Sequence, residues 1–273
     1  GSIVMTVEGI MNRILKKIRT GILAAGFISV SALAMAQNVL SVPGLGTIPL
    51  PHDMQLVDGK GSSVEKMFIE NTQRPDFGES SQAAFMEIVA IPPGMDLFAE
   101  KGTHPFNRAH LYQLQMKKPQ GQYTAGVFVV SGNGKELFPD FRVRAFWDKA
   151  FSEGSDRPTS LFGLPKIQLS EYQSIFDHFL ASRKGNKMKI KVMSFAPWHA
   201  YKNADGTYRW QQEAKAVVTD YRGLSFPVWI YSAFFREGDQ YFLIYLEGSH
   251  MAGAELDEPW LASLYQLKRG DGV

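Results

Sequence analysis

The sequence predicts an α+β fold in which an antiparallel β-sheet is flanked by helices. This is an α/β/α sandwich-like arrangement, preceded by a cleavable signal peptide. Alternating apolar and polar residues recur between residues 187 and 246 with only turns between them, which is typical of antiparallel strands. Residues 170–184 and 258–269 carry apolar residues at helical spacing. The chain has 273 residues, 45% of them hydrophobic, which is enough for a sizeable core.

Residues 11–36 have the three parts of a secretory signal peptide. Basic residues 13–19 precede an uncharged, mostly apolar stretch over residues 21–33, and Ala34-Met35-Ala36 forms an A-x-A cleavage site. The apolar stretch is shorter than the roughly 20 residues of a membrane-spanning helix. We therefore expect cleavage after Ala36. Because no twin-arginine pair precedes the apolar stretch, we expect export by the general secretion route to the bacterial periplasm or the medium.

Residues 37–273 are interpreted as a single mature domain. A boundary between two sub-domains would fall at residues 154–165. Residues 1–10 are interpreted as an upstream extension or a scar. Removal of residues 1–36 leaves 25 basic and 26 acidic residues among 237, a net charge of −1. This balance gives no reason to expect a nucleic-acid partner, and no other apolar segment predicts a membrane span in the mature chain.

The first part of the mature chain predicts short strands. Thr47–Leu50 is expected to form an edge strand that ends at Pro51. The apolar run Phe85–Ile91 is expected to form a further strand, which ends in a turn at Pro92-Pro93-Gly94.

Two longer strands and a helix are expected next. Leu111–Met116 and Tyr123–Val130 predict paired strands joined through residues 119–122, and the apolar run at residues 128–130 indicates a central strand. Asp140–Phe151 fits either a helix with Asp140 as its N-cap or an alternating strand. The helical period extends further along the sequence and favours the helix.

Residues 170–184 predict an amphipathic helix. Ser170 and Gln173 have the spacing of a capping box, and Gly185 supplies a C-terminal stop. The residues of its apolar stripe are Tyr172, Ile175, Phe176, Phe179 and Leu180.

Antiparallel strands are expected over residues 187–195 and 207–219, joined by the connection Ala196–Gly206. Strict alternation in both predicts one buried face and one exposed face. In that pairing, Lys189 and Glu213 lie opposite each other. The apolar run Val228–Phe235 indicates a central strand, a turn at residues 237–239 leads to a partner strand over residues 240–246, and the final helix is expected over residues 258–269.

The order of these elements resembles the PsbP/Mog1-like superfamily. The features that carry the resemblance are the proline-interrupted first strand at residues 47–51, the helix at residues 170–184, the antiparallel meander, the polar-aromatic strand at residues 240–245 and the Trp-containing last helix. The resemblance implies an α/β/α sandwich that acts as a non-enzymatic accessory or binding protein. Residues 64–151 have no counterpart in it, and no functional residues carry over.

The sequence contains no recognisable catalytic, metal or cofactor motif. The absence of cysteine excludes disulfides, a cysteine nucleophile and thiolate metal sites. No G-x-S-x-G, phosphate-binding loop or dinucleotide fingerprint occurs, and residues 131–135 are interpreted as a turn or loop. His104 and His110 lie six residues apart across the change from a loop to a strand and could share a metal, but no metal site and no cofactor are predicted.

Aromatic residues gather around the Ala196–Gly206 connection. Trp198, His199, Tyr201 and Trp210 are the candidate binding residues, because aromatic side chains on a rigid hairpin stack on sugars or peptides. The alternative is that they close the end of the sheet as a small satellite core.

These observations favour an exported, soluble, non-enzymatic binding or accessory module whose partner is an unknown envelope protein or small ligand. One alternative is a secreted or periplasmic hydrolase with a site assembled across the fold, for which His52, His104 or His199 would need a neighbouring carboxylate or hydroxyl. Another is a surface protein that presents the aromatic hairpin to a partner.

Overall fold

The computed structural model describes residues 37–61, 65–66, 69–70, 79, 81–96, 109–154, 169–249 and 251–270. The predicted signal peptide, His104, His250 and almost all of residues 154–165 lie outside this part of the chain. None of the helices in these ranges is long and apolar enough to cross a membrane.

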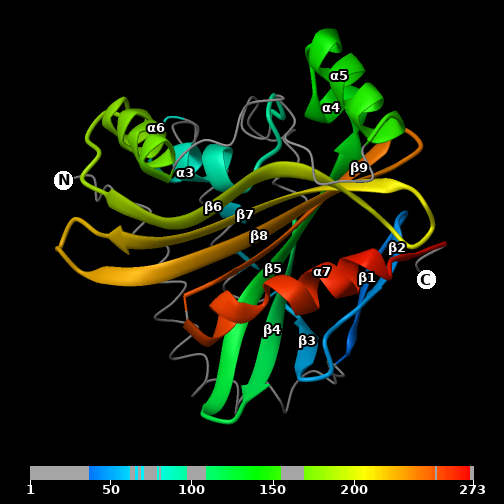
Figure 1. Cartoon of the computed structure of the whole chain (residues 1–273), viewed down its shortest axis with the longest axis horizontal. Helices are drawn as coiled ribbons and strands as arrows, with labels where there is room; N and C mark the ends of the chain where they lie inside the picture. Colours follow the sequence, from blue (N-terminus) through cyan, green and yellow to red (C-terminus); the bar gives the residue numbers. More distant parts are fainter. Residues whose placement is uncertain are drawn as a thin grey trace.

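The described strands form two antiparallel sheets (Figure 1). The large sheet contains, in order across it, β3 (Met54–Asp58), β4 (His110–Lys118), β5 (Gly121–Asn133), β9 (Gln240–Gly248), β8 (Ser225–Glu237), β7 (Tyr208–Thr219) and β6 (Lys189–Lys202). The small sheet contains β1 (Val39–Val42), β2 (Gly46–Pro49) and β10 (Lys268–Arg269), with β2 in the middle. The predicted pairs β4–β5, β6–β7 and β8–β9 are confirmed, and β5 and β8 are interior strands as expected.

Different elements cover the two faces of the large sheet. Helices α3 (Ser81–Val89), α4 (Gly134–Leu137), α5 (Phe141–Ser152) and α6 (Leu169–Ala181) share a core with one face. The small sheet, the 3-10 helix η3 (Met251–Glu255) and α7 (Asp257–Tyr265) share a second core with the other face. In Figure 1, α7 crosses in front of the sheet, and α6 and α5 stand at opposite ends of it. The predicted α+β fold, an antiparallel sheet flanked by helices, is therefore confirmed.

The prediction of a strand over Phe85–Ile91 is wrong, because these residues lie in α3 and the turn that follows it. The helix is buried on several sides, so its apolar run has no helical period, and such a run does not distinguish a buried helix from a central strand. Two polar side chains of the sheet hold its C-terminal carbonyls: Gln212 donates to Ile88 at 2.6 Å and Ser232 donates to Val89 at 3.2 Å.

Helix α5 forms where the longer period predicted a helix. The Asp140 carboxylate caps it by accepting a bond from the Arg142 N–H at 2.9 Å. Trp147, which is fully buried, donates from its indole nitrogen to the Pro93 carbonyl at 3.0 Å. This bond ties α5 to the turn after α3. The glycine-rich residues 131–135, expected to form a turn or loop, instead end β5 and begin α4.

Helix α6 is confirmed, but its capping box is wrong. The helix begins at Leu169, so Ser170 lies inside its first turn, and the Gln173 side chain bonds to β6. The helix packs into the core through Phe176 and Leu180, which are 1% and 3% exposed.

Strand β6 is longer than predicted, because it continues to Lys202 and the connection to β7 is a tight turn at residues 203–207. The aromatic residues expected in a loop are therefore strand residues. Lys189 lies opposite Thr219, and Glu213 lies opposite Ala196, so the predicted Lys189–Glu213 pair is wrong.

The exposed face predicted for β7 is also wrong. Arg209 and Gln211 are each 2% exposed, although they alternate with the apolar residues of the strand. A guanidinium nitrogen of Arg209 donates to the Leu261 carbonyl of α7 at 3.4 Å. The helix thus covers this part of the sheet, which the alternation within β7 does not reveal.

The final helix is shorter than predicted, because α7 ends at Tyr265 and residues 268–269 form β10. β10 pairs with β2 so closely that a Cβ on Gly46 would lie 2.1 Å from the Lys268 carbonyl oxygen. Gly46 has a φ of +143°, so glycine is required here for both conformation and space.

Candidate binding groove

The structure does not gather the four predicted binding residues on one surface. Trp198 and Trp210 are 4% and 5% exposed and belong to the core that the sheet shares with α3, α4, α5 and α6. His199 and Tyr201 are half-buried, and they alternate with the buried residues of β6. The Arg209 guanidinium lies 5.3 Å from the Tyr201 ring centroid. The two tryptophans are therefore part of a main core of the protein and not of a small satellite core, and binding by His199 and Tyr201 stays a prediction.

The described histidines are dispersed. His52 and His178 are exposed, and His199 bonds to the Pro197 carbonyl. His110 contacts the Asp58 carboxylate at 2.8 Å. Within the described residues, no group of three or more His, Asp or Glu side chains could hold a metal ion. The hydrolase alternative stays a prediction.

A groove of about 760 Å³ lies between α6 and the outer edge of β6, which is an edge strand of the large sheet within the described part of the chain. Its helix wall includes Leu169, Gln173 and Leu180, and its strand wall includes Met188, Ile190 and Val192.

The side-chain amide of Gln173 occupies the edge of β6. Its nitrogen donates to the Ile190 carbonyl at 2.7 Å, and its oxygen accepts a bond from the Val192 N–H at 2.8 Å. The Asp177 carboxylate accepts a second bond from the same nitrogen at 2.8 Å. The amide thus takes backbone groups that a neighbouring strand would otherwise use.

A second side-chain amide protects the beginning of the same edge. The Asn186 oxygen accepts from the Met188 N–H, and the Asn186 nitrogen donates to the Met188 carbonyl, both at 3.1 Å. The Ser81 hydroxyl of α3 donates to the Asn186 oxygen at 2.7 Å. Exposed strand edges invite pairing with other chains, and proteins commonly block them.

Beyond Val192, β6 is irregular. Its register with β7 shifts between Val192 and Ser194 and again between Ala196 and His199. Pro197, which lies within the second shift, has no N–H to donate. Bulges and proline both discourage strand addition, so the regular edge is limited to the part of β6 beside α6.

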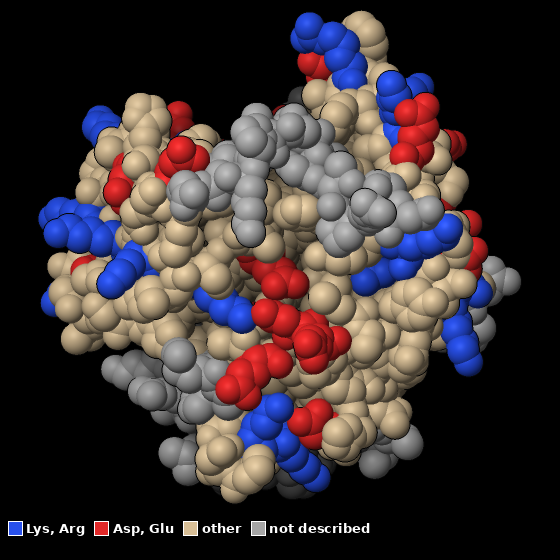
Figure 2. Space-filling model, viewed as in Figure 1, with Lys and Arg blue, Asp and Glu red and all other residues tan. Residues whose placement is uncertain are grey.

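Positive charge lies along the outer face of this edge. Lys187, Lys189 and Lys191 are exposed and alternate with the buried residues of the groove. Figure 2 shows basic side chains gathered at the left of the molecule, where β6 begins beside α6. The groove therefore has an apolar side toward the core and a basic side toward solvent.

Polar side chains of β7 and β8 contact the first turn of α7 and η3. The Lys215 ammonium lies 2.8 Å from the Asp257 carboxylate in the first turn of α7. Burial raises the pKa of the neighbouring Glu213 carboxyl, and the negative charge of Asp257 raises it further. The Tyr231 hydroxyl donates to the Ala254 carbonyl at 2.9 Å. These contacts hold η3 and α7 on the sheet.

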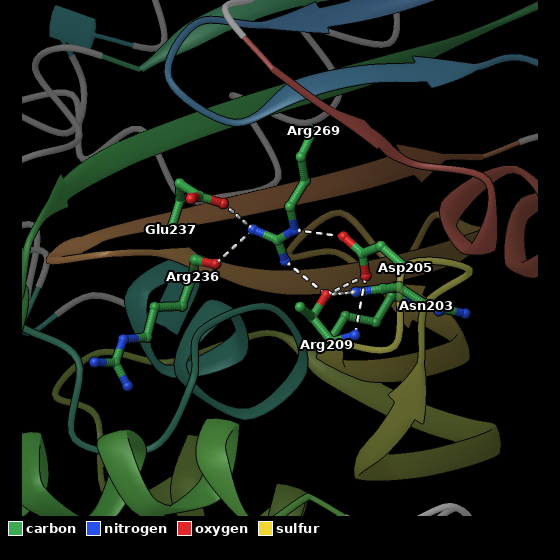
Figure 3. Close-up of polar contacts among 7 residues, drawn as sticks. Asn203, Asp205, Arg209, Arg236, Glu237 and Arg269 are labelled. Carbon is green, nitrogen blue, oxygen red and sulfur yellow. Dashed lines mark hydrogen bonds and ion pairs between the residues drawn. The ribbon is translucent and has the colours of Figure 1, made fainter.

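Arg269 connects three distant segments (Figure 3). Its guanidinium donates to the Asp205 carboxylate at 2.8 Å, to the Thr207 hydroxyl at 3.0 Å, to the Arg236 carbonyl at 2.8 Å and to the Glu237 carboxylate. It therefore ties β10 to the β6–β7 turn and to the β8–β9 turn. This arrangement is structural, because every bond fixes the position of a turn.

The groove is not predictable from the sequence. Residues 187–192 predicted a strand with one basic and one buried face, but an edge position depends on strand order across the whole sheet. Pro197 is the one local signal, because proline within a strand indicates an edge. The spacing of Ser170 and Gln173 predicts a capping box, whereas the Gln173 side chain contacts β6.

No protein-family model matches the chain, and no curated protein sequence matches it. Among solved structures, the chain is similar to the Ran-binding protein Mog1p of Saccharomyces cerevisiae, with 11% sequence identity, a TM-score of 0.29 and coverage of 85% of each chain.

Proposed function

We propose that this protein is an exported, non-enzymatic binding module of the bacterial envelope and that the α6–β6 groove holds its ligand. The observation that carries the proposal is the groove itself. Its volume of about 760 Å³ lies within the range of roughly 300–1,000 Å³ typical of ligand pockets. Apolar side chains for burial and backbone groups for orientation lie side by side in it.

The residues that line the groove favour binding over catalysis. None of the described residues that line it is a histidine, the side chain that most often acts as general base. Asp177 is the acidic residue of the lining, and its carboxylate bonds to Gln173. A ligand here would meet amide, ammonium, hydroxyl and apolar groups, together with one carboxylate that already bonds to Gln173.

The cysteine-free sequence allows a direct test. Ser170→Cys places a single thiol at an exposed position of the groove, and Ser152→Cys places one at the exposed end of α5 as a matched control. Both variants carry the same environment-sensitive fluorophore and are titrated with pooled short peptides and small organic anions. A saturable change at position 170 but not at position 152 supports the proposal. Equal responses, or none at position 170, reject it.

Export rests on the signal-peptide pattern of residues 11–36. Gln37, the first residue after the proposed cleavage site, exchanges backbone hydrogen bonds with Leu56 at 3.0 and 2.6 Å, so cleavage after Ala36 leaves this bridge of the fold intact. The test is N-terminal sequencing of the protein from periplasmic and medium fractions. A mature N-terminus at Gln37 is expected, and full-length protein confined to the cytoplasm contradicts the proposal.

A further inference from the structure

We propose that the groove binds an extended acidic peptide, which adds to the outer edge of β6 after displacing the Gln173 amide. This inference rests on the proposed binding function of the groove and assigns the chemistry of its ligand.

The backbone of β6 supplies the hydrogen bonds for such a strand. The Ile190 carbonyl and the Val192 N–H both point into the groove, because both bond to Gln173. In a β-strand, the N–H and C=O of one residue point to the same side. The Ile190 N–H and the Val192 carbonyl therefore face the same edge, and together these groups match the pairing needs of a peptide backbone.

The displaced group is one that can leave without a change of fold. Gln173 reaches β6 through a flexible side chain, so rotation about its own bonds uncovers the edge while α6 stays anchored by Phe176 and Leu180. The released amide keeps its neighbour Asp177, which already accepts a bond from it. While the Gln173 amide is bound to it, this edge of β6 is protected from pairing with another strand.

Charge and burial define the side chains of the peptide. Alternate side chains of an added strand would lie beside Lys189 and Lys191, where carboxylates are favourable. The side chains between them would face the apolar wall formed by Leu169 and Ile190. The expected pattern is therefore acidic–apolar–acidic.

The same features argue against a second copy of this chain as the occupant. Two β6 edges would bring their lysines close together, and like charges across neighbouring strands are unfavourable. The register shifts after Val192 limit pairing to a short segment, which suits a peptide better than a full strand of another domain.

The experiment measures binding of defined peptides to the mature chain by amide chemical-shift mapping and calorimetry. The probes are blocked pentapeptides of sequence Glu-Val-Glu-Val-Glu, Gln-Val-Gln-Val-Gln and Lys-Val-Lys-Val-Lys, together with an acidic peptide whose alternate backbone nitrogens are methylated. We expect the acidic peptide to bind most tightly, with shifts at Ile190 and Val192. Backbone methylation should weaken binding about tenfold or more, because it removes the strand hydrogen bonds.

Two protein variants test the charge and the displaced amide. Lys189→Glu with Lys191→Glu should weaken the acidic peptide about tenfold, whereas Lys135→Glu with Lys149→Glu, an equal charge change on exposed positions of α4 and α5, should not. Gln173→Ala should tighten binding several-fold, because the peptide no longer competes with the amide. The comparison of the methylated peptide with its parent uses the wild-type protein, so its result does not depend on whether a variant folds.

The outcomes separate this inference from the proposed function. If a neutral or basic peptide, or only a small anion, binds the groove, the acidic-peptide inference is overturned and the binding function stands. If the methylated peptide binds as well as its parent, strand addition is overturned. If no probe perturbs Ile190 or Val192 and the label at position 170 also stays silent, both proposals fail. Dimerisation of Gln173→Ala without peptide binding would instead identify the occupant as a second copy.

Discussion

Replacing Arg269 with methionine should destabilise the fold by about 2–4 kcal/mol. Methionine keeps an apolar stem but removes the guanidinium, which bonds to Asp205, Thr207, Arg236 and Glu237. Hydrogen bonds to charged groups contribute about 1.5–3 kcal/mol each when buried. The Arg269 side chain is 19% exposed, but its carboxylate partners are 32% and 48% exposed, so solvent screening reduces the total.

Urea unfolding of residues 37–273 measures this loss, with Lys268→Met as the control because the neighbouring lysine is exposed. A difference between the two variants smaller than about 0.5 kcal/mol would refute the assignment of Arg269 as a structural link. Arg269→Lys should fall between them, because an ammonium keeps the charge but not the planar set of donors.

The pH dependence gives an independent check of the same link. Burial alone would raise the pKa of Asp205, but hydrogen bonds from Thr207 and the charge of Arg269 bring that pKa below its usual value. A lowered carboxyl pKa contributes stability above the pKa of the unfolded chain, and this stability is lost as the pH falls through the folded-state pKa. The Arg269→Met variant should therefore lose less stability than the wild type on acidification.

Three further predictions concern the core. Burial raises the pKa of the Glu247 carboxyl from 4.5 to about 7. The folded protein should therefore lose up to about 3 kcal/mol of stability as the pH rises from about 4.5 to about 7, because the unfolded chain gives up this proton more readily. Glu247→Gln should abolish that pH dependence in urea unfolding. Gly253→Ala should cost about 1–3 kcal/mol, seen as a lower melting temperature, because its Cβ would lie 2.1 Å from the Trp229 ring. Trp147→Ala should cost about 3–5 kcal/mol and change the near-ultraviolet circular dichroism, because the buried indole anchors α5.

The parts of the fold that the sequence predicted are those set by local pattern. Residues 187–192 alternate between lysines and apolar residues because one face of β6 is buried and the other is exposed, so the period is visible in the chain itself. The turn at residues 237–239 and the apolar run of β8 are equally local. Helix α5 is predictable because its buried residues, Trp147 and Phe151, recur at helical spacing among exposed ones.

The errors arise where burial is decided by distant segments. The apolar run of α3 has no period because it packs against the sheet and α6 at once. Arg209 and Gln211 are buried because α7, about 50 residues later in the sequence, lies over β7. The burial of Trp198 and Trp210 has the same origin, since packing across the whole fold places them in the core.

The two edge strands of the large sheet, β3 and β6, are protected from further strand pairing in different ways. At the β3 edge, backbone bonds between Gln37 and Leu56 protect part of the strand. The far half of β6 is irregular and contains Pro197, which disfavours a partner. Beside α6 the edge is regular and is blocked by the Gln173 amide. A block made by one flexible side chain is reversible in a way that a bulge or a paired backbone is not. The Gln173 position is therefore where this sheet can accept another strand at the smallest structural cost.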